Sequence, residues 1–314
     1  MENLGRYIDP FTDFGFKRLF GSEPHKELLV DFLNELLKGK KQISELRYAQ
    51  NEHVGQTGED RKAVFDLYCI SDQGERFIVE LQKVKQRYFK DRSLFYSSFL
   101  IQEQGQRGDG WDYRLSEVYT IGIMDFAFDD SHPDQFLHEV KLMETTRKEV
   151  FYDKLSFVYL EIVKFNKAEE ELVTHFDKWL FILKNLYHLQ DIPQSLQGDI
   201  FHRLFEIAEV SKLNKKDMDR YQASLKYKRD WQNTLDYAIE EATEKAVKAA
   251  RQEAMQEGVR EGMEKGIEEG MKKGMEKGME KGIVKIAEGM KKKGYSTSEI
   301  ATLTGLSVEK IERL

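Results

Sequence analysis

The sequence lacks the features of an exported or membrane-embedded protein. Its single cysteine, Cys69, excludes a disulfide within the chain and lies in an apolar, strand-like run, which fits a reducing compartment. The first residues show no basic segment followed by an apolar one, and no window approaches the roughly 18 apolar residues of a membrane span. We therefore expect a cytoplasmic protein that is neither exported nor embedded in a membrane.

The sequence also lacks a basic excess and the common motifs for zinc or nucleotides. Its formal net charge is -7, whereas nucleic-acid-binding domains are usually basic. Metal-dependent phosphodiesterases carry acidic residues at their site, however, so this balance decides neither for nor against a nuclease. The seven histidines show no paired zinc spacing, and neither a Walker motif nor a glycine-rich dinucleotide fingerprint occurs.

The first two thirds of the chain combine helical and strand patterns. Apolar residues at helical spacing predict helices at 22–38, 86–104 and 168–189. Short apolar or alternating runs predict strands at 43–51, 62–71, 75–84, 118–124, 136–143 and 155–163. Asp72, Gln73 and Gly74 join two of these strands as a β-hairpin. We expect a mixed α/β fold in which helices flank one sheet.

A charged C-terminal region with a glycine repeat follows a helical extension. Glycine recurs every four residues from Gly258 to Gly282, each followed by Val, Met or Ile. A helix turns about 100° per residue, so this stripe winds around it by about 40° per repeat. Each interior glycine also costs about 1 kcal/mol relative to alanine. Two interpretations remain open: a stalk that dimerises through its glycine face, and a flexible spacer.

Residues 283–314 have the pattern of a helix-turn-helix unit. Ser296 and Glu299 form a predicted capping box, Gly305 ends that helix, and Ser307 begins the next one. The second helix carries two glutamates against one lysine and one arginine, so its attraction to phosphate would be weak. Both DNA contact and a small assembly or dimerisation role stay open for this unit.

Two acidic residues lie within apolar runs on facing strands of the predicted hairpin. Asp66 and Glu80 would be costly to bury unless they were paired, protonated or bound to a cation, so their placement indicates a site for a hard metal ion. Side chains alternate along a strand, so Gln82 shares the face of Glu80 while Leu81 and Lys83 point away.

Ion pairing offers a structural explanation for several of these residues. Asp66 can pair with Arg61 or Lys62 at the edge of the sheet, and the second acid can form a cross-strand pair. Asp13 and Lys17 lie one helical turn apart and can pair with each other.

Six segments carry a family resemblance. DFGFKRLFG, FLNELL, FDLYC, ELQ, RSLFYSS and FNKAEEELVTHFDKWLFILK follow one another between Asp13 and Lys184. In this order and spacing they resemble the Rpn-type recombination-promoting nucleases, also described as PD-(D/E)xK family putative transposases. The resemblance spans residues 6–190. It implies a restriction-endonuclease-like core and a metal-dependent DNA endonuclease of low sequence specificity, linked to recombination or mobile elements.

The resemblance also implies roles for individual residues. Asp66 and Glu80 become the catalytic acids, which hold Mg²⁺ or Mn²⁺ together with the carbonyl of Leu81. Gln82 takes the position of the motif's lysine, an ExQ variant that leaves open which group polarises the attacking water, because glutamine is neither a cation nor a base. Lys17 is one possible substitute, and Lys83 is a poorer one because alternation aims it at the opposite face.

Further residues match recurring positions of the family. Tyr96 and Gln102 follow the second acid on a helix and are expected to contact phosphate or to orient the metal ligands, although helix packing and capping explain them equally well. Asp13 and Lys17 are expected to approach the site.

We therefore expect a nuclease-like domain at 1–190, a helical extension at 191–230, a long helix with the glycine repeat at 231–282, and a helix-turn-helix-like module at 283–314. A homodimer would form through the last two parts and act on DNA. The alternative function is a catalytically weak or inactive nuclease fold that serves as a DNA-binding or regulatory assembly module.

Overall fold

The structure is a computed structural model that describes residues 4–50, 52–53, 63–105, 112–128 and 132–314. The chain divides into two compact units, Met1–Trp231 and Gln232–Leu314. The candidate acidic residues all lie in the first unit, so its sheet is the scaffold that positions them.

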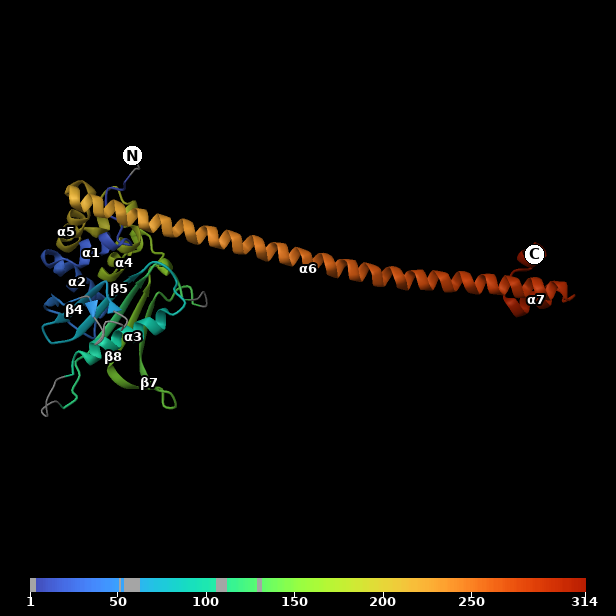
Figure 1. Cartoon of the computed structure of the whole chain (residues 1–314), viewed down its shortest axis with the longest axis horizontal. Coiled ribbons are helices and arrows are strands. Elements are labelled where there is room, and N and C mark those ends of the chain that lie inside the picture. Colours follow the sequence, from blue (N-terminus) through green and yellow to red (C-terminus); the bar gives the residue numbers. More distant parts are fainter. Residues whose placement is uncertain (1–3, 51, 54–62, 106–111, 129–131) are drawn as a thin grey trace. The chain divides into compact units, whose positions relative to one another are not determined.

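The first unit is built on a six-stranded mixed sheet (Figure 1). The strand order is β1-β4-β5-β6-β8-β7, with β5, β6 and β8 parallel and the outer pairs antiparallel. The bounds are β1 Leu46–Tyr48, β4 Leu67–Ser71, β5 Arg76–Gln82, β6 Val118–Met124, β7 Leu137–Glu144 and β8 Glu149–Glu161. A separate two-stranded ladder pairs β2 Glu52–His53 with β3 Ala63–Val64.

Helices cover both faces of this sheet. The α-helices that the described residues form here are α1 Asp13–Phe20, α2 Lys26–Leu36, α3 Phe89–Gln102, α4 His175–Asn185, α5 Asp199–Ala208 and the start of α6 Lys215–Lys292. Short 3-10 helices occur at η1 Glu23–His25, η2 Ile162–Lys164, η3 Glu169–Glu171, η4 Leu186–His188, η5 Gln194–Leu196 and η6 Val210–Lys212. The mixed α/β architecture expected from the sequence is therefore confirmed.

Alternation along the strands creates two cores. In β5, Phe77, Val79 and Leu81 pack in the larger core with α1, α2, α4, α5 and the start of α6. Ile78 faces the opposite side, where it packs with α3 in a smaller core. Glu80 shares the period-two phase of Ile78, so the strand pattern itself directs this carboxylate to the α3 side.

The predicted hairpin forms, but its first strand is divided. β4 and β5 pair with Leu67 opposite Val79, and Gly74 adopts a positive φ of 88° in the turn between them. The residues before Asp66 belong instead to β3, which pairs with β2. The break lies at Asp66 because its bonds to β5 involve side chains: its carboxylate accepts from the Leu81 N–H, and its own N–H donates to the Glu80 carboxylate.

Two other predicted boundaries differ from the structure. The helix expected at 168–189 starts only at His175, because Thr174 and Asp177 form a capping box and a 3-10 turn precedes them. β8 begins at Glu149, before the predicted position, where Val150 and Phe151 are exposed. These two apolar residues lie on an exposed part of the strand, so no buried apolar run in the sequence indicates this stretch.

Residues 191–230 belong to the same compact unit as the sheet. Leu196, Phe201, Phe205, Tyr221 and Leu225 all lie in the larger core. The core therefore extends to the first turns of α6 rather than ending near residue 190.

The second unit consists of the rest of α6, α7 Thr297–Thr304 and α8 Val308–Glu312. Every residue from 236 to 283 is exposed, whereas Ala287, Ile300 and Ile311 form a small core near the C-terminus. The predicted Ser296–Glu299 capping box is present, and Gly305 ends α7 in the left-handed conformation. The glycine repeat thus lies within one continuous helix. Among the described helices, none is long and apolar enough to cross a bilayer.

Candidate active site

The site is set by the pairing of β4 with β5. Leu67 stands opposite Val79, so Asp66, which lies in a bend directly before β4, stands opposite Glu80. Glu80 in turn lies beside Gly122 of the parallel strand β6. The sheet therefore brings the two acids together although 13 residues separate them in the sequence.

Reciprocal hydrogen bonds hold the two acids in place. The backbone N–H of Leu81 donates to Asp66 Oδ2 at 2.7 Å, and the backbone N–H of Asp66 donates to Glu80 Oε1 at 3.2 Å. Gln82 Nε2 donates to Glu80 Oε2 at 3.1 Å. The predicted common face of Glu80 and Gln82 is thereby confirmed. Both carboxylates are oriented by neighbouring amide groups.

Burial makes it costly in free energy to ionise both carboxylates at once. Glu80 is 8% exposed, and Asp66 is half-buried. Burial raises the pKa of Asp66, which the Leu81 N–H and the charge of Lys17 partly oppose. Burial, and then the charge of Asp66, raises the pKa of Glu80 to about 8. Without a counter-charge the pair therefore retains a proton near neutral pH.

A divalent cation fits this pair in charge and in ligand type. Carboxylate oxygens are the ligands that Mg²⁺ prefers, and a dication offsets the charge of Asp66 that, after burial, raises the pKa of Glu80. No cluster of three or more His, Cys, Asp or Glu side chains suited to a metal occurs in the described segments. Further ligands would have to be a backbone carbonyl, an amide oxygen or water.

Helix α3 lies beside the acids and brings Tyr96 to them. The ring of Tyr96 packs edge-on against Phe65, the residue before Asp66, with centroids 5.2 Å apart. Burial raises the pKa of the Tyr96 hydroxyl, and the charges of Glu80 and Asp66 raise it further. The structure thus places Tyr96 within electrostatic range of both acids.

Arg92 is a residue near the acids that the sequence reasoning did not select. It lies one turn before Tyr96 on α3, and its positive charge lowers the pKa of Glu80. Its guanidinium carbon is 5.7 Å from the centroid of the Tyr96 ring. The spacing of four residues within the segment RSLFYSS was the available signal, because residues four apart share a helix face.

Helix α1 contributes two charges that act on Asp66. Lys17 Nζ pairs with Asp13 Oδ1 at 2.8 Å, so the ion pair predicted from their spacing is confirmed. Both charges act on the pKa of Asp66. Burial lowers the pKa of Lys83, and the charge of Asp66 acts on it as well. Both lysines therefore lie within electrostatic range of Asp66.

The remaining predicted residues do not join this group. Gln102 is the last residue of α3 and is exposed. It lies about 9 Å further along the helix axis than Tyr96, since each residue adds about 1.5 Å. Gln104 is the buried amide of this region, and its side chain bonds the backbone of Leu100 and Ser116. Arg61 and Lys62, which could pair with Asp66, lie outside the described residues.

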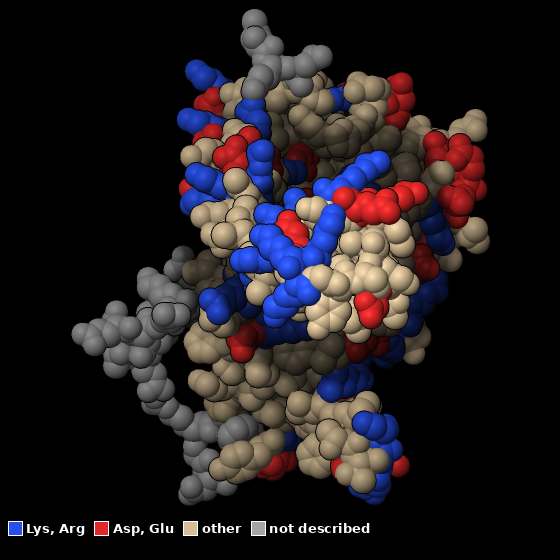
Figure 2. Space-filling view, turned by 90° about the vertical axis from the view of Figure 1, so that its right-hand side faces the viewer, with Lys and Arg blue, Asp and Glu red and all other residues tan. Residues whose placement is uncertain are grey.

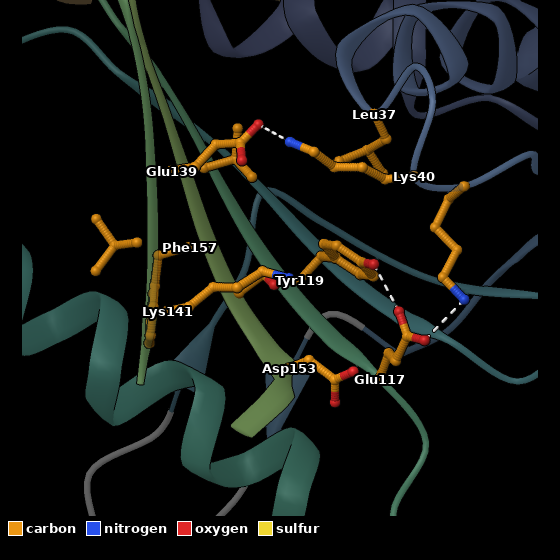
Figure 3. Close-up of a pocket in the computed structure, with 12 residues that line it drawn as sticks. Leu37, Lys40, Glu117, Tyr119, Glu139, Lys141, Asp153 and Phe157 are labelled. Carbon is orange, nitrogen blue, oxygen red and sulfur yellow. Dashed lines mark hydrogen bonds and ion pairs between the residues drawn. The ribbon is translucent and has the colours of Figure 1, made fainter. Parts of the chain in front are cut away.

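A separate cavity of about 220 Å³ lies at the opposite end of β6 and contains neither acid (Figure 3). Its lysines are largely matched by acids: Lys40 pairs with Glu139, and Lys41 Nζ lies 2.7 Å from Glu117 Oε1. On the face shown in Figure 2, Lys and Arg side chains gather near the middle of the view, with acidic side chains beside and between them. The buried acidic pair is thus the stronger candidate for chemistry.

A comparison with known protein families matches most of the chain. The sequence profile described as PD-(D/E)XK nuclease family transposase matches residues 10–238. This span contains both acids, Arg92 and Tyr96, and it includes the helices of the extension. Searches of curated proteins and of solved structures gave no significant match. With most of its length matched, the chain belongs to the PD-(D/E)XK nuclease family transposases.

Proposed function

We propose that the protein is a divalent-metal-dependent DNA endonuclease of low sequence specificity that acts in recombination or in mobile elements. The observation that carries this proposal is the pair formed by Asp66, half-buried directly before β4, and Glu80, buried in β5, each held by a backbone N–H. Two such carboxylates with raised pKa values are a costly arrangement in isolation and are typical of functional sites. Family membership directs this site toward phosphodiester chemistry.

In this proposal Asp66, Glu80 and the carbonyl of Leu81 hold Mg²⁺ or Mn²⁺. The bound ion would lower the pKa of a water and neutralise charge on the phosphate. The amide of Gln82, which already bonds Glu80, orients the carboxylate and the water. The positive charges near Asp66, from Lys17 and Lys83, stabilise the ionised form of that acid.

A second candidate function is a nuclease fold that binds DNA or regulates assembly without efficient cleavage. The observation that favours it is Gln82, which stands at the position of the motif's lysine and has its amide engaged with Glu80. Glutamine supplies neither a positive charge nor a base. Cleavage measurements on purified protein separate the two functions.

Nicking of supercoiled plasmid tests the endonuclease. Wild type is expected to nick the plasmid in Mg²⁺ or Mn²⁺ and to be inactive in EDTA. Asp66→Ala and Glu80→Ala are expected to nick at least about 100-fold more slowly, because the ion is no longer held. Far-ultraviolet circular dichroism checks that the variants are folded. DNA binding without nicking in any metal would instead support the second candidate, and equal nicking by all three proteins would reject this site.

We also propose that the protein is a homodimer joined through α6. The side chains that follow the repeated glycines, such as Met263, Ile267 and Met271, are 60–73% exposed. A Cβ added at any glycine from Gly258 to Gly282 meets nothing within 4 Å, so packing within the chain does not require glycine there. A second helix that approaches this stripe closely would account for both features.

The oligomeric state tests this proposal. Light scattering is expected to give a dimer for the full chain and a monomer for residues 1–245, which retain the whole sheet unit. Changing Met263, Ile267 and Met271 together to Gln is expected to weaken the dimer, because the apolar contact area is lost. The matched control changes Lys265, Lys272 and Lys273 to Gln. A monomeric full-length chain would contradict the proposal.

A further inference from the structure

Arg92 contacts two aromatic rings of its own helix, those of Phe89 and Tyr96. Its guanidinium carbon is 5.7 Å from the ring centroid of Phe89 and 5.7 Å from that of Tyr96. One terminal nitrogen donates to the side-chain oxygen of Gln86. Among the described residues no acceptor bonds its other N–H groups, and the side chain is half-buried. Arg92 is therefore held in place while part of its donor set stays available.

Each aromatic neighbour of Arg92 packs on a residue that is adjacent to one of the two acids. Phe89 packs on Gly122, where an added Cβ would lie 3.1 Å from Phe89 Cζ, and Gly122 is the register partner of Glu80. Tyr96 packs on Phe65, which directly precedes Asp66. These contacts fix the Arg92 side chain on the same side of the sheet as Glu80.

The proposed reaction needs a positive charge at this position. Charge develops on the phosphate oxygens during hydrolysis, and fixed donors are the usual means of stabilising it. Gln82 is uncharged, and Lys17 is already paired with Asp13 at 2.8 Å. A guanidinium binds phosphate through several N–H groups in a fixed plane, and Arg92 presents one beside the acids.

We propose that Arg92 binds a non-bridging oxygen of the scissile DNA phosphate and supplies the positive charge that Gln82 cannot. This inference rests on the proposed endonuclease function and adds a catalytic residue to it. The aromatic contacts place the guanidinium, and Gln86 restricts its rotation. The stack on Tyr96 also assigns that ring a positioning role.

Two readouts on full-length protein test this role. The first is the affinity for a DNA duplex of about 30 base pairs, measured in EDTA by fluorescence anisotropy at several KCl concentrations. The logarithm of the affinity falls linearly with the logarithm of the salt concentration, and the loss of one phosphate contact lowers this slope by about 0.9. Plasmid nicking in Mg²⁺ gives the rate. Arg92→Met, which keeps packing on the rings, is expected to lower the slope by that amount and the rate by about 100-fold.

Arg92→Lys and Arg87→Met are the matched variants. Arg92→Lys is expected to restore the salt slope and only part of the rate, because lysine keeps the charge but not the planar set of donors. Arg87 lies over Tyr88 and is exposed, so Arg87→Met removes the same charge outside the acidic site and should leave the rate unchanged. Thermal melting verifies that all variants are folded.

The outcomes separate this inference from the proposed function. Wild-type rate and salt slope in Arg92→Met, or equal rate losses in Arg92→Met and Arg87→Met, would overturn the role of Arg92 while leaving the endonuclease intact. A wild-type protein that neither binds nor cleaves DNA would overturn the proposed function and this role with it.

Discussion

In EDTA, Glu80→Gln is expected to be more stable than wild type above pH 8, although it removes a catalytic acid. Burial and the charge of Asp66 raise the pKa of Glu80 from 4.5 to about 8. The folded metal-free protein therefore holds a proton that the unfolded chain releases. Glutamine resembles the protonated acid at every pH, so the variant avoids the cost of ionising this position.

The sign of the effect follows from the protons bound in each state. Because the pKa of Glu80 is higher in the folded than in the unfolded state, the proton on Glu80 stabilises the fold. This stabilisation is complete below about pH 4.5 and is lost as pH rises toward 8. The wild type should lose a few kcal/mol across this window, since one pKa unit corresponds to about 1.4 kcal/mol. Glu80→Gln should show a flatter profile. Urea unfolding at several pH values, read by circular dichroism, measures the difference.

Glu170→Gln provides the matched control for this experiment. Glu170 is exposed in η3, so the same chemical change there should leave the dependence of stability on pH as it is in wild type. If Glu80→Gln is instead less stable than wild type above pH 8, the hydrogen bonds of Glu80 to Asp66 and Gln82 outweigh the cost of its charge, and the proposed proton on the pair is wrong.

Strand alternation and hairpin pairing were enough to predict from the sequence how Asp66, Glu80 and Gln82 come together. The phase of β5 placed Glu80 and Gln82 on one face, and the turn at Gly74 set the register that brings Asp66 opposite Glu80. Both features depend on residues close in the sequence. The family resemblance then gave the acids a chemical role that alternation alone could not supply.

Contacts between distant elements were beyond the same reasoning. Arg92 lies near the acids because α3 packs through Phe89 on Gly122 of β6 and through Tyr96 on Phe65, and these contacts depend on the path of α3 across the sheet. The break before β4 could not be predicted either, because the hydrogen bond from the Leu81 N–H to the Asp66 carboxylate replaces a backbone–backbone bond between the two strands. The packing of the helical extension on the sheet unit also depends on contacts between distant residues, such as the bond from the Asp9 N–H to the Tyr221 hydroxyl of α6.

Metal binding is expected to release a proton and to depend on Asp66. The ion must displace the proton that Glu80 holds near neutral pH, because only the ionised carboxylate is a ligand. Roughly one proton per ion should therefore leave at pH 7, and fewer as pH rises past 8. Asp66→Asn keeps the size of the side chain and an oxygen that accepts the Leu81 N–H, but it removes one of the two charges that attract the ion.

Calorimetric titration of Mn²⁺ into wild type and Asp66→Asn at pH 7, in two buffers of different ionisation enthalpy, tests whether Asp66 and Glu80 hold the metal ion. Wild type is expected to bind Mn²⁺ with release of about one proton, and Asp66→Asn to bind at least about 100-fold more weakly, since one ligand charge is lost. Equal affinity in the two proteins, or binding by wild type without proton release, would contradict the assignment of Asp66 and Glu80 as the metal-holding pair.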